Sequence, residues 1–435
     1  MWRAVCALAA AVLLASCGGG GGGSTSGGGS TTPPVTPPPV TLSNFVTVSV
    51  DQGPAGLGYT QSNVAYATIT LCAPGSTTNC QTIDHIQVDT GSVGLRVFKS
   101  VLNPSLLADM TSETDASSNP VGECFQYIDG YVFGSVKNAD LTVGGESVSN
   151  MPLQVLSDGG VFANVPASCT AGGGNNLGNV QDFGSNGIIG IGVTTTDCGA
   201  PCTTSGGVSA AIYYDCPSSG CGAVIGRASN ASAPFQQLPN PVAAMSVDNN
   251  GTSLVLPSVP ISGEQSVTGT LYFGIGTQTN NGLGSAKIYT TTNSNAAFGA
   301  GLITATYNGK TLTESFLDSG SSLYFLVDNS ITPCPASGSF DGLYCPATPV
   351  TLATTIIGQN NAQVAAPVTI YNAQTQFASN DSALPDVAGN PNVIFPNVDL
   401  SDSFDYGLPF FYGRTVYTAI EGRSAGGTIG PYFAF

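Results

Sequence analysis

The sequence predicts an all-β protein, and three observations lead to this prediction. Only 8% of the 435 residues are charged, which is too few to coat the outer faces of long amphipathic helices. The chain contains 57 Gly and 28 Pro, residues typical of turns, while its 42% apolar content suffices for a buried core. A short motif that follows an apolar strand also occurs twice, which suggests two related halves.

The charge balance excludes several classes of function. Asp and Glu number 26 against nine Lys and Arg, which gives a formal charge of −17. Nucleic acids and anionic membrane surfaces both require clustered basic residues, so neither is an expected partner. A zinc site built from imidazoles is also excluded, because His85 is the single histidine. We interpret His85 as a structural residue.

The first 16 residues are typical of a secretory signal peptide. Arg3 precedes an apolar run from Ala4 to Leu14, and small residues follow. The run is too short to span a bilayer. The ending Leu14-Ala15-Ser16-Cys17 resembles the lipobox of bacterial lipoproteins, which implies lipidation of Cys17 and, with Gly18 next, an outer-membrane destination. A plain signal peptide with an incidental Cys17 is the alternative.

A tether is expected between this anchor and the folded body. Residues 18–32 are almost entirely Gly, Ser and Thr, and residues 33–39 are rich in Pro. The first part predicts a flexible coil and the second a stiffer polyproline spacer. We therefore assign residues 17–44 to the lipid anchor and linker, which is the only membrane contact expected.

The cysteines indicate disulfides in an exported chain. Ten remain beyond the signal and the anchor: Cys72, Cys80, Cys124, Cys169, Cys198, Cys202, Cys216, Cys221, Cys334 and Cys345. Cys72–Cys80 and Cys334–Cys345 are the pairs simplest to predict, because each would close a short loop. The sequence leaves the pairing open among Cys198, Cys202, Cys216 and Cys221, and a four-thiolate zinc site there is the less favoured alternative.

Strands and turns follow from residue 45 onward. Residues 45–50 alternate as a strand, and Asn308-Gly309 between residues 303–307 and 310–317 predicts a hairpin with a type I′ turn. Residues 193–238 are rich in Cys, Gly and Ser and are expected to be a loop insertion. We expect an N-terminal lobe over residues 45–278 and a C-terminal lobe over 279–435.

The repeated motif is the most informative feature. Asp89-Thr90-Gly91-Ser92 and Asp318-Ser319-Gly320-Ser321 each follow an apolar strand and precede an apolar run. Gly permits a tight turn, and the hydroxyls can orient a carboxylate by hydrogen bonds. One such match is usually only an Asx turn. Two matches in equivalent settings suggest a duplicated lobe in which each copy contributes one carboxylate to a common site.

At these loops the chain resembles the pepsin-like aspartic peptidases, and the likeness extends over residues 45–435. Tyr127, with Gly130 three residues later, resembles the tyrosine of the family's flap hairpin. The family's apolar-apolar-Gly signatures resemble Gly187-Ile188-Ile189-Gly190 and Phe404-Asp405-Tyr406-Gly407. Two departures stand out: Arg96 lies near the place of the family's Trp, and Asp405 breaks the second apolar pair. The chain also resembles a bacterial lipoprotein group of uncharacterised function.

This resemblance implies a bilobal pepsin-like acid protease fold, with pseudo-twofold related lobes and a cleft between them. It implies a catalytic dyad of Asp89 and Asp318 that shares one proton and activates a water. Thr90 and Ser319 would brace the two loops, Ser92 and Ser321 would bond the outer carboxylate oxygens, and Gly91 and Gly320 would shape the turns. It implies a polypeptide substrate, a flap formed by Tyr127 and Gly130, no cofactor or metal, and a monomer.

Three hypotheses for the function remain at this point. The first is a surface-tethered aspartic endopeptidase, and the second is a pepsin-fold binding lipoprotein without turnover. The third is a surface adhesin or structural β-protein, which predicts that the two Asp side chains lie far apart. Dinucleotide loops at Gly190 and Gly274 are excluded because Thr195 and Thr279 replace the third glycine, and Asp248 begins no EF-hand loop.

Overall fold

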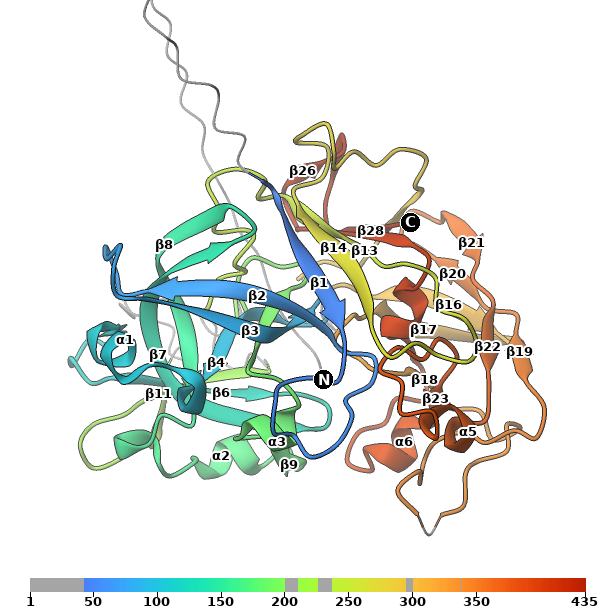
Figure 1. Cartoon of the computed structure of the whole chain (residues 1–435), viewed down its shortest axis with the longest axis horizontal. Coiled ribbons are helices and arrows are strands. Elements are labelled where there is room, and N and C mark those ends of the chain that lie inside the picture. The colour runs from blue at the N-terminus through green and yellow to red at the C-terminus, as the bar shows by residue number, and fades with distance from the viewer. Residues whose placement is uncertain (1–42, 200–209, 226–236, 295–299, 337) are drawn as a thin grey trace, which may run out of the picture.

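The computed structural model describes residues 43–199, 210–225, 237–294, 300–336 and 338–435 (Figure 1). The expected signal peptide, Cys17 and nearly all of the linker lie outside these residues. The described helices are short: α1 (Pro104–Asp109), α2 (Ala167–Thr170), α3 (Val180–Phe183), α5 (Ala373–Phe377) and α6 (Pro391–Ile394), with the 3₁₀ helices η1 (Lys99–Val101), η2 (Gly160–Phe162) and η3 (Leu408–Phe411). No helix in the described ranges is long and apolar enough to cross a membrane.

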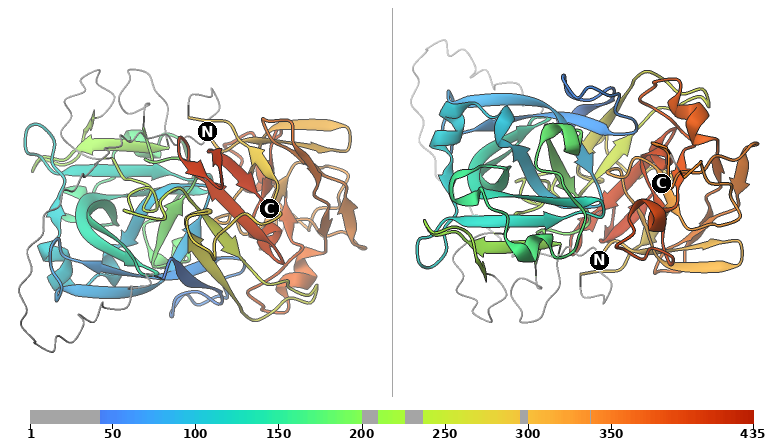
Figure 2. Two further views of the ribbon diagram at one scale, coloured as in Figure 1. Left: turned by 90° about the horizontal axis from the view of Figure 1, so that it is seen from above. Right: turned by 90° about the horizontal axis from the view of Figure 1, so that it is seen from below.

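Strands form two lobes, so the predicted all-β, two-lobed architecture is confirmed (Figures 1 and 2). The strands of the first lobe are β2 (Ala65–Cys72), β3 (Cys80–Asp89), β4 (Val93–Phe98), β5 (Thr111–Ser112), β6 (Val121–Gln126), β7 (Gly130–Val143), β8 (Glu146–Leu156), β9 (Asn175–Asn176), β10 (Gly187–Ile191), β11 (Ala211–Asp215) and β12 (Ala223–Ile225). Those of the second lobe are β16 (Ile303–Tyr307), β17 (Lys310–Leu317), β18 (Tyr324–Leu326), β19 (Val350–Leu352), β20 (Thr355–Ile357), β21 (Gln363–Ala365), β22 (Val368–Ile370), β23 (Ala388–Gly389) and β24 (Phe404–Tyr406).

A further group of strands joins the two lobes, and we call it the interlobe sheet. Its members are β1 (Phe45–Val50), β13 (Gly251–Val255), β14 (Val267–Phe273), β15 (Ile288–Thr290), β25 (Thr415–Ala419) and β28 (Tyr432–Ala434). They pair in the order β1-β14-β13-β25-β28-β15, and β1 also pairs with β2 of the first lobe. A small hairpin of β26 (Ser424–Ala425) and β27 (Thr428–Ile429) lies between β25 and β28 in the chain. Strands from both ends of the chain therefore hold the lobes together.

Each lobe contains the same three-strand unit in the same register. In the first lobe Ile188 of β10 is paired with Gln87 of β3 and Arg96 of β4. In the second lobe Asp405 of β24 is paired with Phe316 of β17 and Phe325 of β18. Gln87 and Phe316 both stand two residues before the motif aspartate. The two units are thus related as the pseudo-twofold prediction requires.

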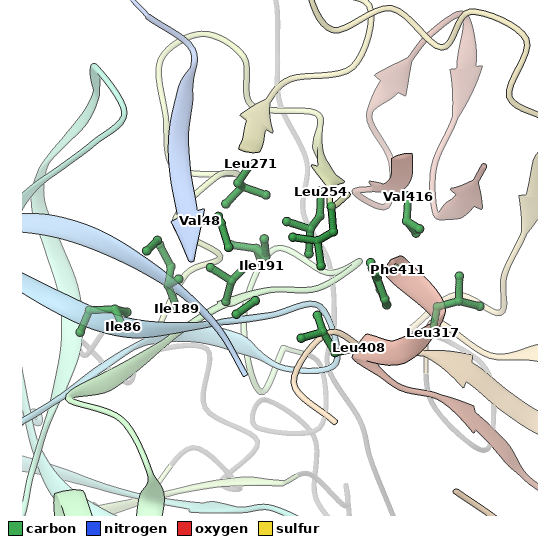
Figure 3. Close-up of a cluster of buried hydrophobic side chains, with 14 of the residues drawn as sticks. Val48, Ile86, Ile189, Ile191, Leu254, Leu271, Leu317, Leu408, Phe411 and Val416 are labelled. Atoms are coloured by element: carbon green, nitrogen blue, oxygen red, sulfur yellow. The ribbon is translucent and has the colours of Figure 1, made fainter. Parts of the chain in front are cut away.

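Apolar side chains from both lobes pack into one core. Val48 of the interlobe sheet, Ile189 of the first lobe and Leu317 of the second are all buried in it (Figure 3). Complete burial of each such side chain contributes about 1.5–3 kcal/mol relative to exposure. Ile189 and Leu317 each lie one residue from the unit positions described above, so the core fixes the three-strand units that hold the motif loops.

Two local predictions from the sequence are confirmed and one is corrected. The strand over residues 45–50 is β1, and Asn308 and Gly309 have the positive φ values, 50° and 76°, of the expected turn between β16 and β17. The expected loop insertion is wrong for residues 211–215. They form β11, which pairs with β6, because their apolar and aromatic side chains are buried there.

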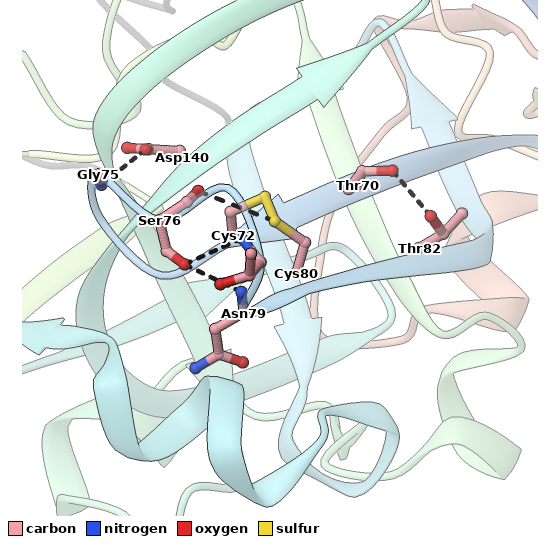
Figure 4. Close-up of a disulfide and its surroundings, with 9 residues drawn as sticks. Thr70, Cys72, Gly75, Ser76, Asn79, Cys80, Thr82 and Asp140 are labelled. Atoms are coloured by element: carbon pink, nitrogen blue, oxygen red, sulfur yellow. Dashed lines mark hydrogen bonds between the residues drawn. A yellow bond between two sulfur atoms is a disulfide. The ribbon is translucent and has the colours of Figure 1, made fainter.

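Disulfides close several of these segments. Both predicted pairs, Cys72–Cys80 and Cys334–Cys345, are formed, and Cys124–Cys169 and Cys216–Cys221 are added. Figure 4 shows the first pair, where the Gly75 amide donates to Asp140 at the tip of the closed loop. Cys198 is also disulfide-bonded, while Cys202 lies outside the described residues. The four-thiolate zinc alternative is wrong, because Cys198, Cys216 and Cys221 are bound in disulfides.

Loss of the Cys124–Cys169 bond should destabilise the protein more than loss of Cys216–Cys221. The first bond joins residues 45 apart and the second residues five apart, and both lie in one buried cluster. Loop-closure entropy predicts stabilisation of about 4 and about 2 kcal/mol, respectively. Double Cys→Ala variants compared by urea unfolding check this. Equal losses would show that packing, rather than chain entropy, sets the effect.

Candidate active site

The two motif loops hold their aspartates in the same way. Asp89 ends β3, and its Oδ1 accepts a hydrogen bond from the Gly91 amide at 2.7 Å while its Oδ2 accepts one from the Ser92 hydroxyl. After β17, Asp318 Oδ1 accepts from the Gly320 amide at 2.7 Å. Its Oδ2 accepts from the Ser321 hydroxyl at 3.0 Å. Each carboxyl is therefore oriented by one backbone and one side-chain donor.

The structure brings these two carboxyls together. Asp89 and Asp318, 229 positions apart, lie within hydrogen-bonding distance of each other, and both are 2% exposed. Each carboxyl also lies against the glycine of the opposite loop. A Cβ on Gly91 would stand 2.6 Å from Asp318 Cγ, and one on Gly320 would stand 2.5 Å from Asp89 Oδ1. Only glycine fits at either place, because the opposing atoms are fixed at the turn.

A reciprocal pair of hydroxyls joins the two loops beneath the carboxyls. The Ser319 amide donates to Thr90 Oγ1 at 2.9 Å, and the Thr90 amide donates to Ser319 Oγ at 3.1 Å. Ser319 Oγ in turn donates to the Val88 carbonyl at 2.8 Å. The Gln87 side chain adds a bond from its Nε2 to the Gly320 carbonyl at 3.0 Å. These buried contacts tie the lobes together at the position of the acids.

Burial and proximity shift the titration of the pair. Desolvation raises the pKa of Asp318 well above its usual range, and repulsion from Asp89 raises that pKa further. Two carboxyls in such contact cannot both ionise without a large cost, so the pair holds one proton over an extended acidic range. One proton on the pair allows it to act as acid and base in the same reaction.

Tyr127 and Gly130 lie at a hairpin tip beside the carboxyls. Tyr127, Ile128 and Asp129 connect β6 to β7, and the Tyr127 amide donates to the Gly130 carbonyl. The Tyr127 ring packs on Phe125, and its hydroxyl is buried without a hydrogen-bond partner. Gly130 is required by close packing, since its Cβ would stand 2.3 Å from the Asn175 carbonyl. The hairpin residues 127–129 therefore line the same cavity as the two acids.

A cleft runs past the acids between the lobes. A cavity of about 180 Å³ is lined by Asp89, Asp318 and Tyr127, together with Phe325 and Phe395 of the second lobe. The neighbouring cavity, about 1080 Å³, is lined by residues 126–129 of the hairpin and by residues 394–400 of the second lobe. Among the described residues, no Lys, Arg or His lines either cavity. This space is large enough for several residues of an extended peptide.

Arg96 has a role that sequence reasoning missed. It is fully buried, with Nη2 at 2.6 Å from Glu123 Oε1 and at 2.9 Å from Asp197 Oδ2. The Tyr213 hydroxyl also donates to Asp197. The guanidinium lies 3.9 Å from the Phe125 ring centre, directly under the ring that supports Tyr127. Asp197 and Tyr213 lie in the segment expected to be an insertion, so no local pattern pointed to this network.

Other candidate groups lie apart from the acids. His85 Nε2 is 3.2 Å from Asp51 Oδ1, and this contact lowers the pKa of Asp51 to about 2. Across the described residues, no group of three or more His, Cys, Asp and Glu side chains is arranged to hold a metal ion. The carboxyl pair is thus the arrangement in the cleft that has an evident chemical use.

Replacement of Thr90 by Val should weaken the connection between the loops. Val has nearly the same shape but leaves the buried Ser319 amide without its acceptor, which costs about 1–3 kcal/mol. Thr90→Ser retains the hydroxyl and is the matched control. Urea unfolding of the three proteins measures the loss. If both variants were equally stable, the hydrogen bond from the Ser319 amide to Thr90 would contribute nothing to stability.

Asp318→Asn should stabilise the protein progressively as the pH rises from about 4 to 7. The raised pKa means that the folded state retains the proton above the ordinary pKa, so stability falls with rising pH in this range. The amide removes that penalty, so the advantage of the variant over the parent should grow across this pH range. Unfolding by denaturant at several pH values checks the trend.

Asp399→Asn provides a control of opposite sign. Hydrogen bonds from Ser401 lower the pKa of this exposed carboxyl, so its contribution to stability is present above the ordinary pKa and is lost at lower pH. The Asn variant should therefore be slightly less stable than the parent at pH 7. If the free energies of unfolding of Asp318→Asn and the parent differed by the same amount at every pH, the raised pKa of Asp318 would be contradicted.

Comparison with known proteins gives a family and a similarity to solved structures. No curated protein sequence matches the chain. A crystal structure of aspartic proteinase from Irpex lacteus is similar over 90% of this chain and 96% of that chain, with 13% sequence identity and a TM-score of 0.48. A family model described as "Protein of unknown function (DUF3443)" matches residues 40–435. The chain therefore belongs to the DUF3443 family.

Proposed function

We propose that this protein is an aspartic endopeptidase. The single observation that carries the proposal is the contact between the Asp89 and Asp318 carboxyls at the floor of the interlobe cleft. Buried carboxyls in contact are costly, and they are retained in proteins chiefly where a shared proton is used. The hypothesis of an adhesin or structural β-protein predicted separate carboxyls, and their contact argues against it.

The chemistry follows from one proton on two carboxyls. The ionised member accepts a proton from a water molecule, whose oxygen attacks the carbonyl carbon of the substrate peptide bond. The protonated member donates a hydrogen bond to the carbonyl oxygen as negative charge develops there. When the tetrahedral intermediate collapses, the C–N bond breaks, and the proton taken from the water passes from the pair to the leaving amine nitrogen, which returns the pair to its one-proton state. The amide donors of Gly91 and Gly320 hold the carboxyls in the required orientation throughout. The two acids act as a pair, so neither is assigned a fixed role.

The cleft suits an extended polypeptide. The larger cavity begins at the hairpin tip and extends along residues 394–400, next to the acids. Gln126, Asn175 and Asn397 supply amide groups that can hydrogen-bond a peptide backbone, while Phe316 and Phe395 offer apolar contacts.

We propose a monomer that needs no cofactor. We also propose that a lipid on Cys17 anchors it in the outer membrane, through the linker that ends near residue 44.

Acid-dependent cleavage of unfolded protein tests the proposal. The chain without residues 1–42 should cleave a denatured substrate protein at acidic pH and lose cleavage as the shared proton is lost. Asp89→Asn and Asp318→Asn should each reduce kcat/KM by about 10³-fold, since each removes half of the acid–base pair. Fragments are measured by mass spectrometry.

Two controls separate catalysis from contamination and from binding. Asp341→Asn, at an exposed acid that lines neither cavity, should cleave at nearly the parent rate. A peptide with a tetrahedral hydroxyl-bearing carbon in place of the scissile carbonyl should inhibit the parent. Cleavage that persists in both dyad variants would refute the assignment. Peptide binding without cleavage by the parent would instead identify a binding protein, the second hypothesis.

A further inference from the structure

A third buried acid lies beside the carboxyl pair. Asp405 is in the middle of β24, between Phe316 of β17 and Phe325 of β18. Because paired residues in a sheet point to the same face, Asp405 shares the face of Phe316, and Asp318 follows two residues later on that face. Asp405 is 6% exposed, and its Oδ1 has no hydrogen-bond partner.

The first lobe has no such acid. Ile188 occupies the register position of Asp405, paired with Gln87 and Arg96 as Asp405 is paired with Phe316 and Phe325. The pseudo-twofold arrangement therefore gives an internal reference in which an apolar residue completes the same three-strand unit. An acid at this place is not required by the fold. A buried acid with an unpaired oxygen destabilises a protein, so its presence here points to a functional role.

Asp405 contacts the site through one hydroxyl. Its carboxyl lies within hydrogen-bonding reach of the Ser321 side chain, and the Ser321 hydroxyl donates to Asp318 Oδ2 at 3.0 Å. The charged groups that act on Asp405 are Asp89 and Asp318, both acidic. Glu314 shares its face of β17 two residues before Phe316, while Tyr324 and Tyr406 alternate to the opposite face. Among the described residues, no base forms an ion pair with Asp405.

The Ser321 hydroxyl has one proton and can donate one hydrogen bond. The protonation state of Asp405 therefore decides whether Ser321 donates to Asp405 or to Asp318. An ionised Asp405 would accept the hydrogen bond from the Ser321 hydroxyl, and Asp318 Oδ2 would then lack its donor. A protonated Asp405 would instead donate to Ser321 Oγ, and Ser321 would remain a donor to Asp318. Burial raises the pKa of Asp405 well above its usual range; the nearby Ser321 hydroxyl opposes this shift, and repulsion from Asp89 adds to it. The observed bond from Ser321 to Asp318 agrees with the protonated form.

We propose that Asp405 is a positioning residue that remains a protonated acid, donates to the Ser321 hydroxyl, and thereby directs that hydroxyl onto Asp318. Its effect on rate rests on the proposed peptidase function, but the location of its proton does not. When Asp405 ionises, the donor to Asp318 is lost and a third negative charge appears beside the pair. The ionisation of Asp405 therefore sets the upper pH limit for catalysis by Asp89 and Asp318.

The first test compares Asp405→Asn with Asp405→Ala in the peptidase assay. The Asn amide can donate to Ser321 as the protonated acid does, so kcat should stay within about threefold of the parent, and activity should extend to higher pH. Ala removes the donor, so kcat should fall about tenfold with little change in KM. Asp386→Asn, at a half-buried acid of the second lobe that lines neither cavity, should leave the upper pH limit unchanged.

The second test needs no catalysis. Carboxyl ¹³C resonances of Asp-labelled protein are followed against pH, and the Asp405→Asn variant assigns the Asp405 signal. The signal should remain that of the acid form at pH 6. Titration near the ordinary pKa of about 4 would overturn the proposal, as would an unchanged pH profile and kcat in Asp405→Ala. A protonated Asp405 in a protein that cleaves nothing would support this inference while the peptidase function fails.

Discussion

Two like-charged carboxyls in buried contact are the constraint on which the rest of this structure depends. Without compensation, Asp89 and Asp318 would repel each other and would lose the solvation of water. The loops compensate with backbone amides, with the hydroxyls of Ser92 and Ser321, and with one shared proton. Glycines at positions 91 and 320 allow the approach, since any side chain there would occupy the place of the opposite carboxyl.

Such a contact between distant loops requires a rigid frame. The Thr90–Ser319 brace holds the loops locally, while the interlobe sheet joins strands from the beginning, the middle and the end of the chain. The buried core continues across both lobes, from Val48 through Ile189 to Leu317. A shift of either lobe would therefore disturb packing as well as the hydrogen bonds between the loops. The chemistry in the cleft and the stability of the fold are supported by the same strands.

The two lobes repeat a plan but differ in the polar groups placed around it. In the first lobe Arg96 binds Glu123 and Asp197 beneath the ring of Phe125, next to Tyr127. In the second lobe the equivalent register position is Phe325, and the acid appears on the next strand as Asp405. Buried polar groups of this kind act strongly on their neighbours because the local dielectric constant is low. These differences are where this chain departs from the pattern that its sequence resembles.

The sequence by itself determined the strand-rich class, the I′ turn at Asn308-Gly309, two short-range disulfides and the duplicated loops, because each depends on residues close together in the chain. Cys124–Cys169, the strand at residues 211–215 and the partners of Arg96 depended on contacts between distant segments that no local pattern specifies. The register of the two three-strand units was likewise visible only in the folded chain. That register showed that Asp405 lies next to Ser321, at the position that Ile188 occupies in the first lobe. The tertiary structure decided these features because burial and pairing across the sheet, rather than propensity, set which side chains meet.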